Sequence, residues 1–293
     1  MTDHRTWDEW IGRSVTARDT ASAAPVANFF ALLDRSSEDA ATLPPLAHWL
    51  YFLPLARQSE LGADGHPKLG VFLPDLGLPR RMWAGSRIRF HQPIAVGASL
   101  TRRTTIRSIS LKQGSTGPLG FITLSHEVSS GDELLVSEEQ DLVYRQAPGA
   151  AGVQAKRKTA KPGEPATGEI LARKRFDAIE LFRFSALTGN THRIHYDVDY
   201  ARDVEGYAGL VVHGPFQAMV LMDQYRRSRP YARITAFEFR ATAPLFAGEK
   251  ASFCVDGDDP TTLRVHPLGR EPSMTATIHA TVSASARKDV LPS

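Results

Sequence analysis

The order of secondary-structure signals in this 293-residue chain repeats once, and the repetition limits the folds that the chain can adopt. Each half contains one apolar stretch at helical spacing, followed by several runs of β-branched and aromatic residues broken by Gly, Pro and Asp turns. The helical stretches are residues 26–33 and 215–229, and the strand-like runs are residues 86–91, 99–109, 121–129, 134–144, 234–239, 250–255, 263–266 and 273–283. One helix followed by antiparallel strands, twice over, predicts a duplicated α+β unit in which each sheet wraps around its helix.

A short internal similarity supports the duplication. Residues 88–97 and 237–248 both have the pattern of an aromatic strand, a proline, an apolar pair and a glycine turn. Between the halves, residues 148–170 are rich in Pro, Gly, Ala and Lys, a composition that cannot bury a core. We therefore predict an N-terminal domain over residues 1–147, a linker over 148–170 and a C-terminal domain over 171–293.

The composition, with 42% hydrophobic and 23% charged residues, is that of an ordinary globular protein. A formal net charge of +3 with scattered arginines disfavours nucleic acid as a partner and is compatible with a small ligand carrying phosphates or carboxylates. The single cysteine, Cys254, excludes an intrachain disulfide, so we expect a core position and a reducing compartment. The first residues contain no apolar signal region, and no apolar run approaches the roughly 20 residues of a membrane span. We therefore expect a cytoplasmic protein with no membrane partner.

The densest group of chemically active side chains lies in residues 184–197, which hold two histidines, an amide, an arginine and a carboxylate. The turn sequence 188–190 is included, because Gly and Asn tolerate positive φ. A few residues later, Gly214 and Pro215 precede an apolar run, a pattern that predicts a helix start with unpaired backbone N–H groups. Together these segments predict a polar catalytic strip beside an oxyanion-binding helix start.

The same residues resemble a known family. Residues 186–201 and 209–214 resemble the MaoC-like, (R)-specific enoyl-CoA hydratase branch of the hotdog fold, in which an acid and a histidine five positions apart precede a Tyr-Ala pair and a V-x-H-G element. The chain keeps His195, Tyr200-Ala201 and Val212-His213-Gly214, and has Asn190 at the acidic position. In the first half, residues 78–85, preceded by Asp64-Gly65-His66-Pro67, resemble the two-hotdog subgroup of itaconyl-CoA and mesaconyl-C4-CoA hydratases.

This resemblance implies a double hotdog fold, two units each with an antiparallel sheet around a central helix, and a CoA-thioester substrate. No separate cofactor is expected, because CoA is part of the substrate. It implies a hydro-lyase that reversibly hydrates itaconyl-CoA or mesaconyl-C4-CoA to citramalyl-CoA. The alternatives are an (R)-specific enoyl-CoA hydratase or β-hydroxyacyl thioester dehydratase of fatty-acid metabolism, and a non-catalytic acyl-CoA-binding hotdog protein. A monomer and a homodimer are both compatible with it, since a duplicated pair can bury sheet edges within one chain.

Hydration of an enoyl thioester needs a base for the water, a proton donor for the α-carbon and stabilisation of the thioester oxygen. His195 is the predicted base, since the unperturbed pKa of histidine lies near neutrality, and the N–H of Gly214 is the predicted oxyanion donor. Asn190 can hold a water or a carbonyl but cannot shuttle a proton. Either His195 acts as both base and acid, or a carboxylate supplies the second function, with Asp197 and Glu138 as candidates.

Substrate contacts are predicted around the same strip and in the first half. A free carboxylate on the acyl group matches a guanidinium, which can donate two parallel hydrogen bonds to it. The predicted substrate-binding residues are Arg80, Arg81, Trp83, Arg193, Val212 and His213.

A rival interpretation is a metal hydrolase. His192, His195 and Asp197 form an H-x-x-H-x-D pattern, and His213 is near in sequence, which on a loop could ligate zinc or iron. The sequence contains no glycine-rich nucleotide loop and no G-x-S-x-G elbow. We predict the hydratase and no metal.

Overall fold

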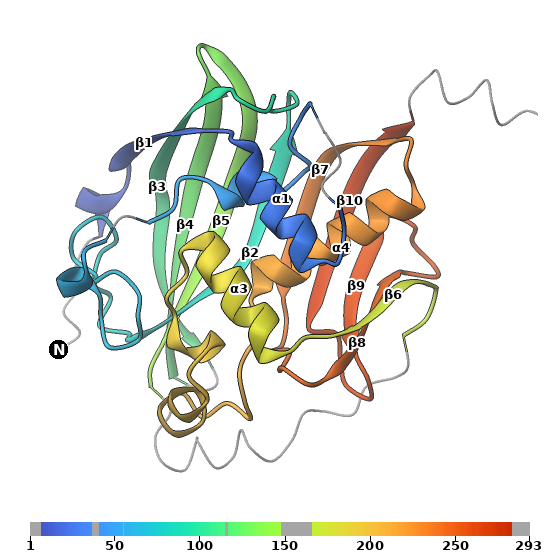
Figure 1. The fold of residues 1–293 in the computed structure, drawn as a ribbon. Helices are drawn as coiled ribbons and strands as arrows, with labels where there is room; N and C mark the ends of the chain where they lie inside the picture. The colour runs from blue at the N-terminus through green and yellow to red at the C-terminus, as the bar shows by residue number, and fades with distance from the viewer. Residues whose placement is uncertain (1–6, 37–40, 55, 115–116, 148–165, 283–293) are drawn as a thin grey trace, which may run out of the picture.

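The structure, a computed structural model, describes residues 7–36, 41–54, 56–114, 117–147 and 166–282. Its strands form one ten-stranded sheet in the order β1-β3-β4-β5-β2-β7-β10-β9-β8-β6, with antiparallel pairing and with the α-helices on one face (Figure 1). The first-half strands are β1 (Ser14–Thr20), β2 (Arg80–Phe90), β3 (Ser99–Gly114), β4 (Gly117–Ser130) and β5 (Glu133–Arg145). The second-half strands are β6 (Glu169–Arg175), β7 (Ala232–Ala241), β8 (Lys250–Val255), β9 (Thr262–Pro267) and β10 (Met274–Val282), and the α-helices are α1 (Ala23–Leu32), α3 (Ala178–Thr188) and α4 (Gly214–Ser228).

The two halves meet where β2 pairs with β7, from Gly85 opposite Arg240 to Arg89 opposite Ala236. At Gly85, which follows a register shift in β2, the partner strand comes very close. A Cβ added there would lie 2.3 Å from the carbonyl oxygen of Phe239. The absence of a side chain at this point is therefore a condition for a sheet that continues from one half into the other.

Helix α4 is the central helix of the second half. Nine of its fifteen residues are buried, more than the single stripe that a surface helix buries. The helix begins at Gly214, has Pro215 in its first turn and ends at Ser228, close to the predicted range of 215–229. Pro230 cannot continue it. The sequence prediction of this helix is confirmed.

Helix α1 confirms the helix predicted over 26–33 in the first half, but its place in the unit differs from that of α4. Helix α1 follows β1 as α3 follows β6, so its counterpart is α3 and not α4. In the described residues between α1 and β2, the helical segments are the short 3-10 helices Ala47–Leu50 and Gln58–Glu60. Residues 41–79 contain six prolines, which interrupt helical hydrogen bonding. The face of β3–β5 that a second central helix would cover therefore remains available for a cavity.

All eight predicted strands are present, and the two strands that were not predicted, β1 and β6, lie at the edges of the sheet. Their residues are mostly exposed and do not alternate between apolar and polar. Edge strands of this kind lack the period-two signal on which strand prediction depends.

Of the predicted linker, residues 148–165 lie outside the described residues, and β6 already begins at Glu169. The main hydrophobic core joins apolar side chains of both halves, including Leu100, Val136, Phe216 and Phe237. The division into two domains thus stays a prediction. None of the helices in the described residues has the length and apolar character needed to cross a bilayer.

We expect Gly85→Ala to destabilise the protein, because the new methyl group would force β2 and β7 apart. Overpacking of this kind costs about 1–3 kcal/mol, to be measured as a lower melting temperature. Gly209→Ala is the matched control, since a Cβ at Gly209 meets nothing within 4 Å. Equal melting temperatures for the two variants would contradict the role given to Gly85.

Candidate active site

A cavity of about 880 Å³ lies between the polar strip of the second half and the sheet of the first half. Its polar end contains Asn190, His192 and His195 together with the start of α4. Its floor is formed by β3, β4 and β5, on the sheet face that has no second central helix. The floor residues are Arg102, Leu124, His126, Val128, Val136, Glu138, Gln140 and Leu142.

The end of α3 fixes the polar strip in space. The helix starts at a capping box in which Asp177 and Glu180 exchange hydrogen bonds, and it ends at Gly189 with a φ of 60°. The backbone N–H of Asn190 then donates to the carbonyl of Ser185 over 2.9 Å, as in a Schellman ending. The Asn190 side chain accepts from the N–H of His192 over 3.0 Å, so this amide holds the turn while it lines the cavity.

His195 has the form required of a base. Its Nδ1 lies 2.7 Å from the carbonyl oxygen of Val211. Because a carbonyl only accepts, Nδ1 carries the proton and Nε2 keeps a lone pair. Burial lowers the pKa of His195 to about 4, although the bond to Val211 opposes the shift. The imidazole is therefore neutral at neutral pH and able to take up a proton.

The start of α4 lies next to His195. His213 precedes the helix, stacks on His195 with ring centroids 3.6 Å apart, and shares a hydrogen bond of 2.9 Å with the Ser185 hydroxyl. Burial, followed by the neighbouring His195 and His192, keeps the pKa of His213 well below its ordinary value. Gly214 lines the cavity, and its N–H belongs to the first turn, where helical N–H groups have no intrahelical acceptor. An anionic oxygen could be stabilised here.

The predicted substrate-binding residues do not all reach the cavity. Arg80, Arg81, Trp83, Val212 and His213 line it, and Arg193 does not. The Arg193 guanidinium instead donates to Asp197, over 2.7 Å from Nη2, and to the carbonyl of Ala63. Because these contacts engage the guanidinium outside the cavity, Arg193 is not part of the proposed substrate site.

Neither carboxylate candidate for the proton donor is suited to that role. Asp197 pairs with Arg193 and accepts from the backbone N–H of Tyr200, which lowers its pKa. Glu138 accepts from Trp49 over 2.9 Å and from the Ser86 hydroxyl over 2.6 Å. Although its burial raises the pKa, the hydrogen bond and charge of His48, followed by His126 and Ser86, outweigh this and bring the pKa to about 2. Both carboxyls are therefore ionised and carry no proton to give.

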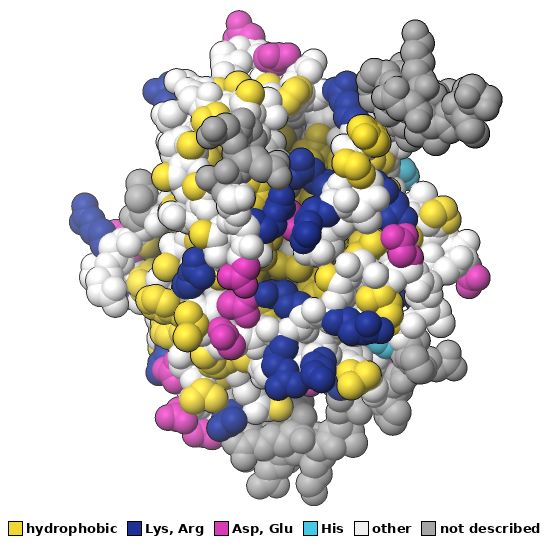
Figure 2. All heavy atoms as spheres, turned by 45° about the vertical axis from the view of Figure 1, so that its right-hand side comes forward, with side chains coloured by type: hydrophobic (Ala, Val, Ile, Leu, Met, Phe, Trp, Pro, Cys, Tyr) yellow, Lys and Arg dark blue, Asp and Glu magenta, His cyan; other side chains and the backbone are white. Residues whose placement is uncertain are grey.

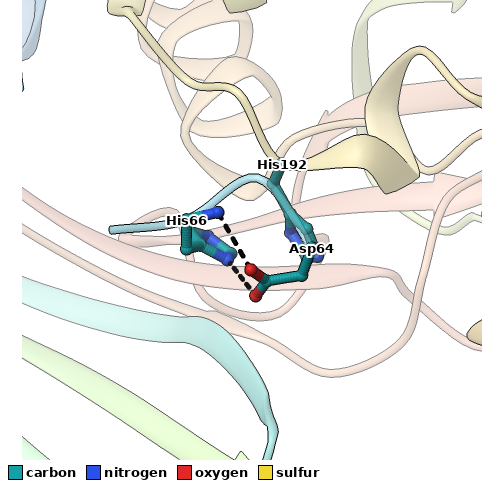
Figure 3. A group of neighbouring side chains, drawn as sticks. All are labelled: Asp64, His66 and His192. Atoms are coloured by element: carbon teal, nitrogen blue, oxygen red, sulfur yellow. Dashed lines mark hydrogen bonds and ion pairs between the residues drawn. The ribbon is translucent and has the colours of Figure 1, made fainter. Parts of the chain in front are cut away.

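Two residues that were not predicted as site residues lie at the polar end of the site. Asp64 and His66 belong to the loop before β2 and lie beside His192 (Figure 3). His66 Nδ1 is 2.8 Å from Asp64 Oδ2, and the rings of His66 and His192 are 4.1 Å apart. In the sequence, Asp64 and His66 stood out only through the resemblance of residues 64–67 to the two-hotdog hydratases. Their distance of 126 residues from the strip left no local signal of the contact.

The side chains that could ligate a metal are not the ones that the sequence pattern predicted. The group whose donor atoms lie within 4.8 Å of one another is Asp64, His66 and His192, and not the H-x-x-H-x-D pattern. Within this group, Asp64 is already bonded to His66, and the positive charge of Arg81 acts on both histidines. This surrounding favours a hydrogen-bonded Asp–His pair over a cation.

Comparison with known proteins identifies the family. The family model for hydroxyacyl-thioester dehydratase type 2 matches residues 46–247. The chain is 46% identical over 245 residues to a mesaconyl-C(4)-CoA hydratase of Chloroflexus aurantiacus, covering 82% of this chain and 85% of that protein. The chain belongs to the hydroxyacyl-thioester dehydratase type 2 family.

Solved structures agree on the fold of this family member. A MaoC-like dehydratase from Phytophthora capsici matches with a TM-score of 0.65 and 14% identity, over 96% of this chain and 100% of that one. A Mycobacterium tuberculosis protein described as having a double hotdog fold matches with a TM-score of 0.56 and 16% identity, over 92% and 96%. The predicted MaoC-like resemblance and the double hotdog fold are confirmed, and the family is one of hydro-lyases, as expected.

We expect His195 to remain neutral, with its proton on Nδ1, above about pH 5, because burial holds its pKa at about 4. Long-range ¹H–¹⁵N correlation spectra of the histidine side chains would show one protonated and one unprotonated nitrogen, assigned with His195→Gln. The urea-unfolded chain is the control and should titrate near about pH 6.5. A His195 signal that titrates near neutrality in the folded protein would contradict this assignment.

Proposed function

We propose that the protein reversibly hydrates a short dicarboxylic enoyl-CoA, with mesaconyl-C4-CoA and itaconyl-CoA as candidate substrates and citramalyl-CoA as the product. The observation that carries the proposal is the 46% identity to a mesaconyl-C(4)-CoA hydratase over most of both chains. The polar end of the cavity offers the base and the N–H donor that such a reaction requires.

In this proposal the thioester oxygen faces the N–H of Gly214. His195 Nε2 takes a proton from water as the water oxygen bonds to the β-carbon, and the π electrons move onto the thioester oxygen. The first turn of α4 stabilises the developing negative charge, since helix N-termini favour anions. The half-buried position of Gly214 screens this interaction less than bulk water would.

Arg81 is the arginine best placed for the second carboxylate. In mesaconyl-C4-CoA this carboxylate is attached to the β-carbon itself, so its partner must lie beside the reacting atoms. The charge of Arg81 acts on both His66 and His192. Arg80 is already paired with Glu205, whereas among the described residues no carboxylate forms an ion pair with Arg81.

The charge of the surface is compatible with a CoA ester. Figure 2 shows a group of Lys and Arg side chains around apolar surface in the middle of one face of the molecule. The net charge of +3 has the sign that attracts the phosphates of CoA.

A second candidate is a β-hydroxyacyl thioester dehydratase acting on longer acyl chains. The apolar part of the cavity floor, with Leu124, Val128 and Val136, favours this alternative because it extends beyond the polar end. A short C5 acyl group would not fill it. Rates on mesaconyl-C4-CoA, itaconyl-CoA, crotonyl-CoA and a long-chain enoyl-CoA separate the two functions, and no turnover of any would indicate a non-catalytic protein.

We expect His195→Ala to lower kcat on mesaconyl-C4-CoA by about 10²–10⁴-fold, the usual contribution of a general base. The loss of absorbance of the enoyl thioester measures the rate. His91→Ala is the control, because His91 is an exposed histidine whose side chain bonds to Ser137, outside the cavity lining. Full activity of folded His195→Ala would rule out the proposed base.

We expect Arg81→Met to weaken the preference for mesaconyl-C4-CoA over crotonyl-CoA. The ratio of the two kcat/KM values should fall by about 10- to 100-fold, which is the 1.5–3 kcal/mol of a charge-assisted hydrogen bond. Arg89→Met, at an exposed position of the same strand, is the matched control. An unchanged ratio in Arg81→Met would show that the carboxylate binds elsewhere.

A further inference from the structure

The site as described so far lacks a donor for the α-carbon proton. Asn190 cannot give a proton, and Asp197 and Glu138 are ionised and engaged in other bonds. His195 can take the proton from water, but its conjugate acid forms at the water and β-carbon side of the reaction. A second proton-transfer group on the same cavity would complete the chemistry.

The loop that carries Asp64 and His66 is held rigidly against the polar strip. Gly65 has a φ of 91°, and a Cβ added there would lie 1.9 Å from the carbonyl oxygen of Thr191. The Thr191 hydroxyl donates to the carbonyl of Gly65, and the N–H of Arg193 donates to the carbonyl of Asp64 over 2.9 Å. These contacts fix a first-half loop onto the second-half strip.

Asp64 sets the orientation and tautomer of His66. Its Oδ1 accepts from the backbone N–H of His66 over 3.0 Å, and its Oδ2 lies 2.8 Å from His66 Nδ1. Asp64 has a lowered pKa because its bonds and charge interactions with His66 outweigh its burial, so the carboxylate is ionised. His66 Nδ1 therefore donates to Asp64, and Nε2 remains for the cavity, which His66 lines.

We propose that His66 is a second catalytic residue, which transfers the proton to and from the α-carbon of the thioester, and that Asp64 is its positioning residue. The assignment rests on the proposed hydration reaction. It gives the site two imidazoles with separate tasks, and the ring of His192 lies 4.1 Å from that of His66 and 5.5 Å from that of His195.

The hydration step balances when His66 and His195 together hold one extra proton. In hydration, neutral His195 takes a proton from water as the oxygen–β-carbon bond forms and the π electrons become the enolate. The His66 imidazolium gives its Nε2 proton to the α-carbon as the thioester carbonyl re-forms. The proton on His195 then returns to His66 by exchange with water. In dehydration, neutral His66 removes the α-proton, and the His195 imidazolium protonates the leaving hydroxyl.

The charges around His66 make its protonation sensitive to the substrate. Burial is the main cause that lowers its pKa, Asp64 raises it, and Arg81 lowers it; the other titratable groups that face it are His192 and His195. A carboxylate bound to Arg81 would cancel this cation and add a negative charge. We expect a dicarboxylic substrate to favour the protonated, proton-donating form of His66, so that its carboxylate raises kcat and does not only lower KM.

The deciding experiment follows the α-hydrogen of the hydrated product in D₂O by NMR. His195→Ala should still exchange the α-hydrogen for deuterium while losing hydration, since its α-carbon base remains. His66→Gln should lose both, with exchange slowed by about 10²–10⁴-fold and an unchanged melting temperature. Exchange at the wild-type rate in folded His66→Gln would overturn the proposal.

Asp64→Asn provides a second test that does not depend on removing the histidine. Without the carboxylate, the pKa of His66 should fall further. The alkaline limb of the kcat profile, where the one-proton state is lost as pH rises, should therefore shift to lower pH. A purely structural role of Asp64 would lower the rate without moving this limb, and an unmoved limb would contradict its coupling to His66.

Failure of this proposal can be distinguished from failure of the proposed substrate class. If crotonyl-CoA is hydrated better than mesaconyl-C4-CoA, the dicarboxylic substrate is wrong, and the exchange test is run on 3-hydroxybutyryl-CoA with the same expectation for His66. Elemental analysis of the purified protein is the remaining arm. A stoichiometric metal that is lost in His66→Gln would overturn the proton-transfer role.

Discussion

The pairing of β2 with β7 is the interaction on which the rest of the molecule depends. It joins two sheets into one and places the sheet face of the first half beside the polar strip of the second. The close approach at Gly85 permits this continuity, and the shared core keeps both halves in one register. The site is assembled from residues 64–66 on one side and 190–195 on the other, and therefore depends on the junction of the halves.

Much of the fold could be predicted from the sequence because its strongest signals are local. Helix α4 has apolar residues at helical spacing and begins with Gly-Pro, and the inner strands carry β-branched and aromatic residues. The edge strands β1 and β6 face solvent and lack such a pattern. Helix α3 was not predicted, although Asp177 and Glu180 form a recognisable capping box. Its apolar residues Ile179 and Phe182 are exposed, so the buried stripe does not stand out in the sequence.

The candidate site likewise has residues that local sequence signals predict and residues that they do not. His195 and Gly214 could be chosen from the sequence, since each stands in a short segment whose turn chemistry is visible. The Asp64–His66 pair could not be assigned a role, because its partners lie more than a hundred residues away and no local pattern encodes that contact. The place of the first-half helix could not be predicted for a related reason: an apolar stretch at 26–33 indicates a helix but not its position in the unit.

The two halves are unequal, and their difference explains the site. The second half keeps its central helix and supplies an N-terminus for a developing oxyanion. The first half has short 3-10 helices there, which leave room for an acyl group and bring a loop with an Asp–His pair to the strip. Burial, together with the neighbouring histidines and arginines, lowers the pKa of His66, His192, His195 and His213. Protonation of His66, which the proposed proton transfer requires, therefore depends on the charge of the bound substrate. Recognition of an anionic acyl group is in this way coupled to the proton transfer.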